Sequence, residues 1–261
     1  MLSRFIHAQL ALGLSQALAV AIAALTVAAL AQRRLQQPLL PELLLALVRG
    51  MGQILLVGSL LVVLLHGPQW TAWPVLALMM TAAANIVSRR AQRVPRAFTL
   101  ALVCVFCGAG GVIALMSALG VVQLRILMLI PVGSMVIANV MNMQALFYNR
   151  FTAEVTSHTG EIESALALGA TSTTAVRPYL NAAFRASLIP ATDNLRSLGI
   201  VWIPGLMAGM VLSGSPPLYA ALYQFVVLAM IFTAGSLSCL IASYLLPARI
   251  FTPNEQLLLR L

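Results

Sequence analysis

Two charged residues beside an apolar segment are the first candidates for chemistry in this sequence. Asp193 and Arg196 are three positions apart, so on a helix they share a face and can form an ion pair. The uncharged run that follows, residues 198–212, is too short to cross about 30 Å of hydrocarbon at 1.5 Å per residue. We therefore expect this span to begin near Pro190 and to carry both charges to the membrane edge or deeper.

A charge pair in that position is costly and usually faces the interior of a helix bundle or a water-filled path. This predicts Asp193 as a metal-cation contact and Arg196 as its gate or partner. The alternative is a pair that only anchors the end of the helix.

Methionine and asparagine side chains in two apolar segments are the next candidates. Met135 and Asn139 are four positions apart, with Met141 close behind, and Met207 lies in the following apolar segment. Thioethers suit soft metals such as Cu(I), whereas Fe²⁺ prefers imidazole and carboxylate, so methionine alone does not favour iron. We expect a substrate path along Met135, Asn139, Met141, Arg196 and Met207. Packing is the competing role for methionine at helical spacing.

The cysteines form a weaker signal. Cys104 and Cys107 make a C-x-x-C, which on a helix would place both thiols on one face, where they could bind a metal or cycle redox. Small apolar packing residues are the simpler interpretation. The three histidines, His7, His66 and His158, are scattered, so no span contains a histidine ligand set.

The composition determines the class of protein that must position these residues. Hydrophobic residues make up 61 % of the chain and charged residues 8 %, and the mean hydropathy is +0.98. This predicts an all-α integral membrane protein with room for about seven spans in 261 residues, as a single transmembrane domain over residues 1–261. The apolar run from Leu10 to Ala31 is longer than the core of a signal peptide and is followed by Arg33 and Arg34, so we expect a retained first helix.

The basic residues predict the orientation. All fifteen are arginine, and the absence of lysine excludes a P-loop, which needs a lysine to reach nucleotide phosphates. With the N-terminus outside, seven spans place thirteen arginines on the inner face and leave Arg4 and Arg125 outside. The expected topology is N-out and C-in, in a multi-pass cell-membrane protein. The basic cluster at residues 89–96 is then a topology determinant against anionic lipid rather than a nucleic-acid site.

One long polar segment interrupts the apolar pattern at about residues 150–188. Thr159 is a candidate N-cap, and Gly169 can adopt the left-handed conformation that ends a helix. Thr171 or Ser172 can then cap a second helix. The segment therefore predicts a short cytoplasmic helix, a glycine elbow and a helix returning to the membrane. The alternative is an amphipathic helix that lies passively on the bilayer.

A family resemblance rests on this segment and on several others. Glu163-Ser164-Ala165-Leu166-Ala167-Leu168-Gly169 resembles the first half of the E-A-A-x-x-x-G loop of ABC-transporter permeases, which forms a coupling helix that docks on the ATPase subunit. The second half of that loop differs here. The chain as a whole is similar to the FetB family of ABC permeases, with these further matching segments: Arg49 to Gly58, Ile130 to Asn149, Leu168 to Thr171, Arg185 to Asp193, Pro204 to Gly209 and Gly235 to Leu245.

The resemblance implies a function and partners. It implies an ATP-driven export permease for a metal cation such as iron, acting as a homodimer with a separate FetA-like ATPase. Glu163, Ala165 and Gly169 would be the coupling residues. ATP and Mg would be bound by the ATPase, with no cofactor on this chain. The plant relatives of the family are linked to aluminium tolerance and nucleotide-sugar transport, which leaves a nucleotide-sugar or amphiphile as alternative cargo.

Two other classes of function are weaker. An intramembrane enzyme lacks support because the chain has one aspartate rather than a dyad, no H-E-x-x-H and no G-x-S-x-G. A secondary transporter would work without an ATPase, but the sequence shows no convincing inverted repeat.

Overall fold

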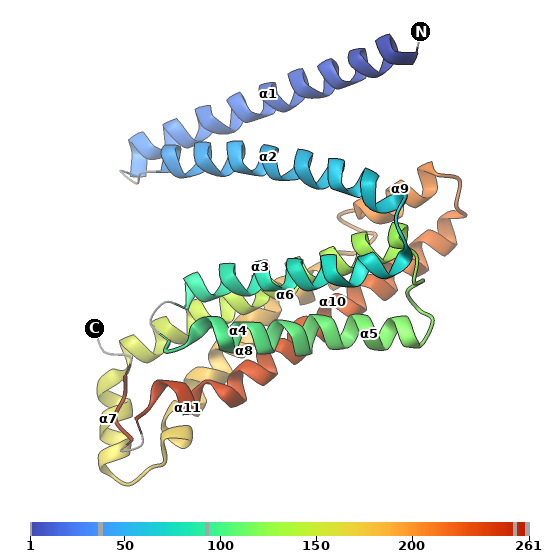
Figure 1. The fold of residues 1–261 in the computed structure, drawn as a ribbon. Coiled ribbons are helices and arrows are strands. Elements are labelled where there is room, and N and C mark those ends of the chain that lie inside the picture. Colours follow the sequence, from blue (N-terminus) through green and yellow to red (C-terminus); the bar gives the residue numbers. More distant parts are fainter. Residues whose placement is uncertain (1, 36–38, 92–93, 253–254, 259–261) are drawn as a thin grey trace. The chain divides into compact units, whose positions relative to one another are not determined.

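The part of the chain that the structure describes, residues 2–35, 39–91, 94–252 and 255–258, is helical and contains no β-strand in this computed structural model (Figure 1). It divides into two compact units, Met1–Gly67 and Pro68–Leu261. Each unit has its own internal packing and is described separately below.

The first unit is a pair of long apolar helices. α1 spans Leu2–Leu35 and α2 spans Leu39–Leu65. The side-chain carbonyl of Gln32 accepts a hydrogen bond of 3.1 Å from the backbone N–H of Leu40, which satisfies a free donor at the start of α2. The charges at the helix ends suit the helix dipole, which favours acids in the first turn and bases in the last. α2 has Glu42 in its first turn, and α1 has Arg33 and Arg34 in its last turn.

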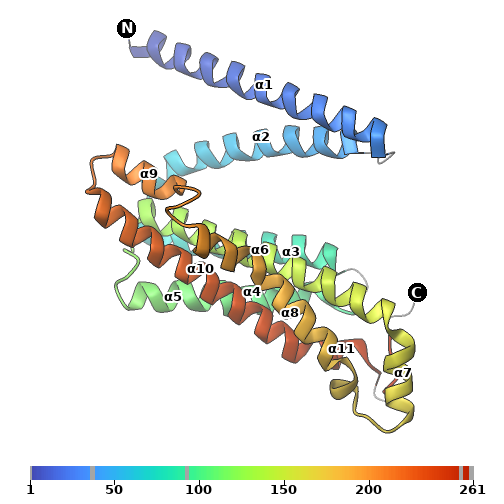
Figure 2. The same cartoon turned by 180° about the vertical axis from the view of Figure 1, so that it is seen from behind.

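The second unit is a helix bundle built around two long helices, α6 and α10. In chain order, its elements are the 3₁₀ turn η1 (Gln69–Thr71), α3 (Ala72–Arg90), α4 (Ala97–Val105), the π-helical turn η2 (Phe106–Gly110), α5 (Gly111–Ala118), α6 (Ile126–Ser157), α7 (Thr159–Ala167), α8 (Ser172–Ser197), α9 (Gly205–Leu212), α10 (Pro217–Leu245) and α11 (Pro247–Ile250). Figure 2 shows α7 and α11 at one end of this unit and α9 at the opposite end.

Three glycines allow the helices of the second unit to approach closely. A Cβ added at Gly108 would lie 2.5 Å from the Cβ of Ser238, and one added at Gly133 would lie 2.7 Å from a methyl carbon of Leu76. At Gly235 the added atom would collide with the side chain of Met143. Such small residues are typical of helix contacts in membranes, where association depends on close packing and interhelical hydrogen bonds.

Six of the described helical segments are long and apolar enough to cross a membrane. Two are in the first unit and four in the second: Gln69–Arg90, Ala97–Ala118, Ile126–Ser157 and Pro217–Leu245. The chain is therefore an all-α, multi-pass membrane protein, as its composition predicts.

The expected sixth span is not one continuous helix. α8 ends at Ser197 and α9 begins at Gly205, so the segment that we expected to run from near Pro190 to Leu212 is broken at residues 198–204. Gly199 has a φ of +75°, and its N–H donates to the carbonyl of Trp202 at 3.1 Å. Pro204 then caps α9 in an extended conformation. The apolar content of this region was visible in the sequence, but the break at residues 198–204 was not.

The position of Arg196 also differs from the one that the sequence predicts. Arg196 is 24 residues beyond the start of α8 at Ser172, which at 1.5 Å per residue is about 36 Å along the helix. Our sequence-based topology placed Arg196 on the inner face, together with the polar segment that contains the elbow. In the structure it lies at the end of α8 that is remote from α7.

Candidate functional site

The polar segment forms a corner between α6 and α8, with α7 as its middle element. Four side chains hold this corner together. The hydroxyl of Tyr179 on α8 donates a hydrogen bond of 3.0 Å to Oε2 of Glu161 on α7, and its ring stacks on that of His158 with centroids 4.9 Å apart. Ile162 on α7 is only 1 % exposed, so this apolar side chain anchors the short helix to the bundle.

The acidic groups of the corner also affect the Tyr179 phenol. The pKa of Tyr179 is raised. Burial is the largest cause, followed by the hydrogen bond to Glu161 and the charges of Glu161 and Glu154. Glu154 itself forms an ion pair of 2.7 Å with Arg150, one turn earlier on α6. Tyr179 is therefore a hydrogen-bond donor to Glu161, and Glu154 has its own partner in Arg150.

The elbow after α7 has the geometry that the sequence predicts. Gly169 has a φ of +90°, and the N–H of Ala170 donates to the carbonyl of Ala165 at 3.0 Å while that of Gly169 donates to Leu166 at 2.9 Å. This is the Schellman pattern of helix termination. Thr171 then caps α8, accepting a hydrogen bond from the N–H of Thr174 at 3.3 Å.

The start of α7 differs from the prediction. Thr159 is not an N-cap: its hydroxyl donates to the carbonyl of Val155 at 3.0 Å, so it is bonded back to α6. His158 occupies the cap position, with no side-chain capping bond. α6 continues to Ser157, and the chain turns directly into α7, which leaves no separate capped start.

The outer surface of the elbow combines polar and apolar groups. Glu163 and Gly169 are exposed, whereas Ala165 is half-buried. Leu168, next to the glycine, is 90 % exposed. A leucine so exposed at the tip of a turn is available for contact with another surface.

The predicted substrate-path residues separate into small groups. On α6, Nδ2 of Asn139 donates to the carbonyl of Met135 at 2.8 Å, and both residues are half-buried. Met141 is also half-buried. It lies two residues beyond Asn139, and a rotation of about 100° per residue puts it about 200° around the helix from Asn139. Met207 is on α9, likewise half-buried. Met135 and Asn139 therefore share a face, and Met141 does not belong to it.

The predicted charge pair is present but exposed. Nη1 of Arg196 lies 3.9 Å from Oδ1 of Asp193, and their side chains are 78 % and 61 % exposed. Exposed pairs of this kind contribute little to stability. Among the described residues, no three His, Cys, Asp or Glu side chains are close enough to hold a metal ion, so a metal contact at Asp193 would need further ligands from backbone, water or another chain.

The two cysteines of the C-x-x-C differ in exposure. Cys104 is buried at the end of α4, whereas Cys107 is exposed in the π-turn η2. A metal or redox site shared by the two thiols therefore stays a prediction.

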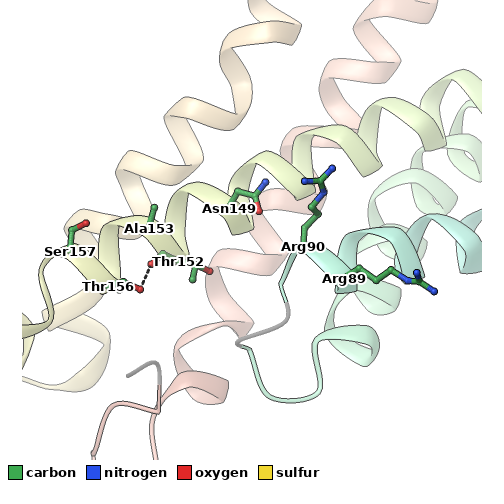
Figure 3. Close-up of a pocket in the computed structure, with 7 residues that line it drawn as sticks. All are labelled: Arg89, Arg90, Asn149, Thr152, Ala153, Thr156 and Ser157. Carbon is green, nitrogen blue, oxygen red and sulfur yellow. Dashed lines mark hydrogen bonds between the residues drawn. The ribbon is translucent and has the colours of Figure 1, made fainter. Parts of the chain in front are cut away.

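Two polar cavities open on the second unit. One, of about 450 Å³, lies between the end of α3 and α6 (Figure 3). The other, of about 400 Å³, lies between α8 and α10 and is lined by Thr173, Thr174, Arg177, Leu180, Asn181, Phe184, Leu240, Ser243 and Tyr244. Neither cavity has a carboxylate among its lining residues, so both favour anions over cations.

Comparison with known proteins places this chain in a family. The profile of the uncharacterised protein family UPF0014 matches residues 15–251. The chain belongs to the UPF0014 family. Over 245 residues it is 29 % identical to the probable iron export permease protein FetB of Escherichia coli, covering 93 % of this chain and 94 % of that protein.

Other UPF0014 members are equally similar. The membrane protein YjkA of Bacillus subtilis is 30 % identical over 221 residues, covering 83 % of this chain and 87 % of YjkA. The rice membrane protein STAR2 is 32 % identical over 218 residues, covering 83 % of this chain and 76 % of STAR2. No solved structure matches the chain significantly.

The structure of this UPF0014 chain contains a polar network that sequence reasoning missed. In the bundle interior, Nε2 of Gln144 donates to the hydroxyl of Ser238 at 2.6 Å, and that hydroxyl donates to the carbonyl of Cys104 at 2.7 Å. Gln144 and Ser238 are fully buried. The sequence contains one signal for this network, a glutamine within the apolar run of α6. A buried side-chain amide requires a hydrogen-bond partner, so such a residue indicates a polar contact inside the bundle.

Proposed function

We propose that this chain is the membrane permease subunit of an ATP-driven exporter that moves a metal cation, with iron as the first candidate, out of the cytoplasm. The observation that carries the proposal is the α6–α7–α8 corner. It is a short helix, braced by Tyr179 and Ile162 and ended by a Schellman turn at Gly169, with Leu168 exposed at its tip. A rigid, protruding element of this kind suits the transmission of movement from a partner to two helices of the bundle.

The partner in this proposal is a separate, FetA-like ATPase. The sequence has no lysine for a P-loop, so ATP and Mg would be bound by the other chain. Glu163, Ala165 and Gly169 would meet the ATPase surface. The name of the E. coli relative, probable iron export permease protein FetB, supports the assignment.

The arginine distribution supports a cytoplasmic position for the corner. Five arginines lie towards the α7 end of the second unit (Figure 1). They belong to the ends of α3, α6 and α11 and to the start of α8: Arg89, Arg90, Arg150, Arg177 and Arg249. Arg125 precedes α6 at the other end, and Arg196 lies at the end of α8 that is remote from α7. This asymmetry favours α7 inside and agrees with an N-out, C-in topology.

A homodimer completes the proposed transporter. Gly205 and Gly209 on α9 form a G-x-x-x-G, and a Cβ added at either position would meet nothing within 4 Å. A small-residue face left open in one chain suits close contact with a second copy. Cargo would then pass along Met135, Asn139 and Met207, with Asp193 as the metal contact.

A second cargo class has its own support. The cavity between α8 and α10 offers Arg177, Asn181 and the hydroxyls of Ser243 and Tyr244, with no carboxylate in its lining. Such a cavity suits an anionic molecule, for example a nucleotide-sugar or a charged amphiphile, better than a free cation.

One experiment distinguishes these proposals. The chain is purified with its co-expressed ATPase, reconstituted in liposomes, and assayed for ATP hydrolysis against a panel of metal ions and a panel of nucleotide-sugars. Stimulation by Fe²⁺ or another metal supports the first cargo, and stimulation by nucleotide-sugars supports the second. Transport by the purified chain without any ATPase would refute the ATP-driven proposal.

A further inference from the structure

The cavity between α3 and α6 is built from two arginines and one face of a helix. Arg89 and Arg90 come from the last turn of α3, and the remaining lining residues are Asn149, Thr152, Ala153, Thr156 and Ser157 of α6. Positions 149, 152, 153 and 156 repeat at helical spacing, so they lie on a single face of α6. Figure 3 shows this row along α6, with the two arginines projecting from α3.

The cavity lining carries two positive charges and no carboxylate. Arg89 and Arg90 are exposed, and no carboxylate of the described residues lies within ion-pair distance of either. The carboxylate of Glu154, also on α6, is paired with Arg150 and does not line the cavity. Two unpaired guanidinium groups beside amide and hydroxyl donors favour a phosphate-like anion.

One hydroxyl in the cavity wall lacks a partner. Oγ1 of Thr152 is buried and makes no hydrogen bond with any described group. The neighbouring hydroxyl of Thr156 already donates to the backbone carbonyl of Thr152 at 2.7 Å. Buried polar atoms are normally satisfied, so the free Thr152 hydroxyl points to a ligand that accepts a hydrogen bond there.

The depth of the cavity identifies the source of the anion. The candidate span that ends at Arg90 has 22 residues, about 33 Å of helix, which matches the hydrocarbon core of a bilayer. Asn149 is 23 residues beyond Ile126, the first residue of its own span, or about 35 Å. Both walls of the cavity therefore reach the level of the lipid headgroups.

We propose that this cavity is a binding site for the phosphate of an anionic lipid headgroup. Arg89 and Arg90 neutralise the phosphate, and Asn149, Thr152 and Ser157 donate hydrogen bonds to its oxygens. The bound lipid links the end of α3 to residues 149–157 of α6, immediately before α7 begins. The site is independent of the cargo and of the ATPase partner.

The test uses the full-length chain, purified and delipidated in detergent. Binding of phosphatidylglycerol, phosphatidylcholine and inorganic phosphate is measured by native mass spectrometry and by the shift in thermal unfolding midpoint. The double variant Arg89→Gln/Arg90→Gln removes the charges, and Thr152→Val removes the hydroxyl at nearly constant volume. Arg33→Gln/Arg34→Gln is the matched control, because these arginines are an exposed adjacent pair in the last turn of another spanning helix.

We expect phosphatidylglycerol affinity to fall on the order of tenfold in the double variant and about threefold in Thr152→Val, with the control within about twofold of the wild type. Phosphatidylcholine and inorganic phosphate should bind weakly throughout. Equal loss in the control would show that only general surface charge is involved and would overturn the proposal. Unchanged lipid binding in Thr152→Val and the double variant, or equal stabilisation by inorganic phosphate, would also overturn it.

Discussion

The hydroxyl of Tyr179 reaches across the elbow to Oε2 of Glu161, at 3.0 Å, from a residue 18 positions away in the chain. This bond connects the first turn of α7 to the third turn of α8, and the stacked ring of His158 extends the connection to the end of α6. Three helices are thus joined by one aromatic side chain. The ends of α6, α7 and α8 are therefore tied together at this corner.

Replacement of Tyr179 by phenylalanine should loosen the corner without unfolding the protein. The variant keeps the ring and loses the hydrogen bond, which at this exposed position is worth about 1 kcal/mol or less. We expect a thermal unfolding midpoint close to that of the wild type and a lower ratio of transport to ATP hydrolysed. Tyr219→Phe, at an exposed tyrosine of α10, is the control. An unchanged ratio in Tyr179→Phe would argue against a mechanical role for the bond.

Replacement of Gly169 by proline should uncouple hydrolysis from transport. Proline fixes φ near −65°, whereas Gly169 has a φ of +90°, and it removes the N–H that bonds to Leu166. The elbow must then change direction, while the helices of the bundle remain packed. ATPase activity and transport are measured together in liposomes, with Gly160→Ala as control because nothing lies within 4 Å of an added Cβ there. Normal transport in Gly169→Pro would contradict the coupling role.

Charge reversal at Glu163 tests the proposed ATPase contact directly. Glu163 is exposed on α7, so Glu163→Arg should leave folding intact and weaken assembly with the ATPase or its coupling to transport. The measurement is co-purification of the two chains, followed by the ratio of transport to hydrolysis. Glu42→Arg reverses an exposed acid in the first turn of α2 and serves as control. Equal behaviour of the two variants would remove Glu163 from the interface.

Asp193→Asn should impair metal efflux with little effect on stability or ATPase assembly. The ion pair with Arg196 is long, at 3.9 Å, and exposed, so its loss should cost well under about 1 kcal/mol. Efflux is followed as metal resistance of cells and as metal uptake by inverted vesicles. Arg196→Gln breaks the same pair but keeps the carboxylate, which separates metal contact from pair loss. Full resistance in Asp193→Asn would exclude it from the path.

Gly108→Ala should destabilise the bundle, and Gly111→Ala should not. The added Cβ at Gly108 would lie 2.5 Å from the Cβ of Ser238 and 2.8 Å from the carbonyl oxygen of Ala234, whereas Gly111 has nothing within 4 Å. Overpacking of this kind costs about 1–3 kcal/mol. Unfolding midpoints in detergent measure the difference. Equal stability of the two variants would show that η2 can shift away from α10.

Local sequence features predicted much of this protein. The apolar runs identified the membrane class and six of the seven expected spans, because hydropathy depends on each segment alone. The elbow was also predicted, since Gly169 and Thr171 have conformational preferences that act over a few residues. The i,i+3 pair of Asp193 and Arg196 follows from helix periodicity in the same way.

Contacts between distant segments depended on the tertiary structure. Thr159 bonds back to Val155 rather than capping α7, and the π-turn η2 places Gly108 directly against Ser238 of α10. The chain is also broken between Ser197 and Gly205, in a region that hydropathy presented as continuous. The bond between Gln144 and Ser238, 94 residues apart, and the cavity that joins Arg90 to Thr152 exist only because packing brings those helices together. Hydropathy and turn preference are properties of neighbouring residues, but partners for buried polar groups are supplied by whichever helix packs beside them.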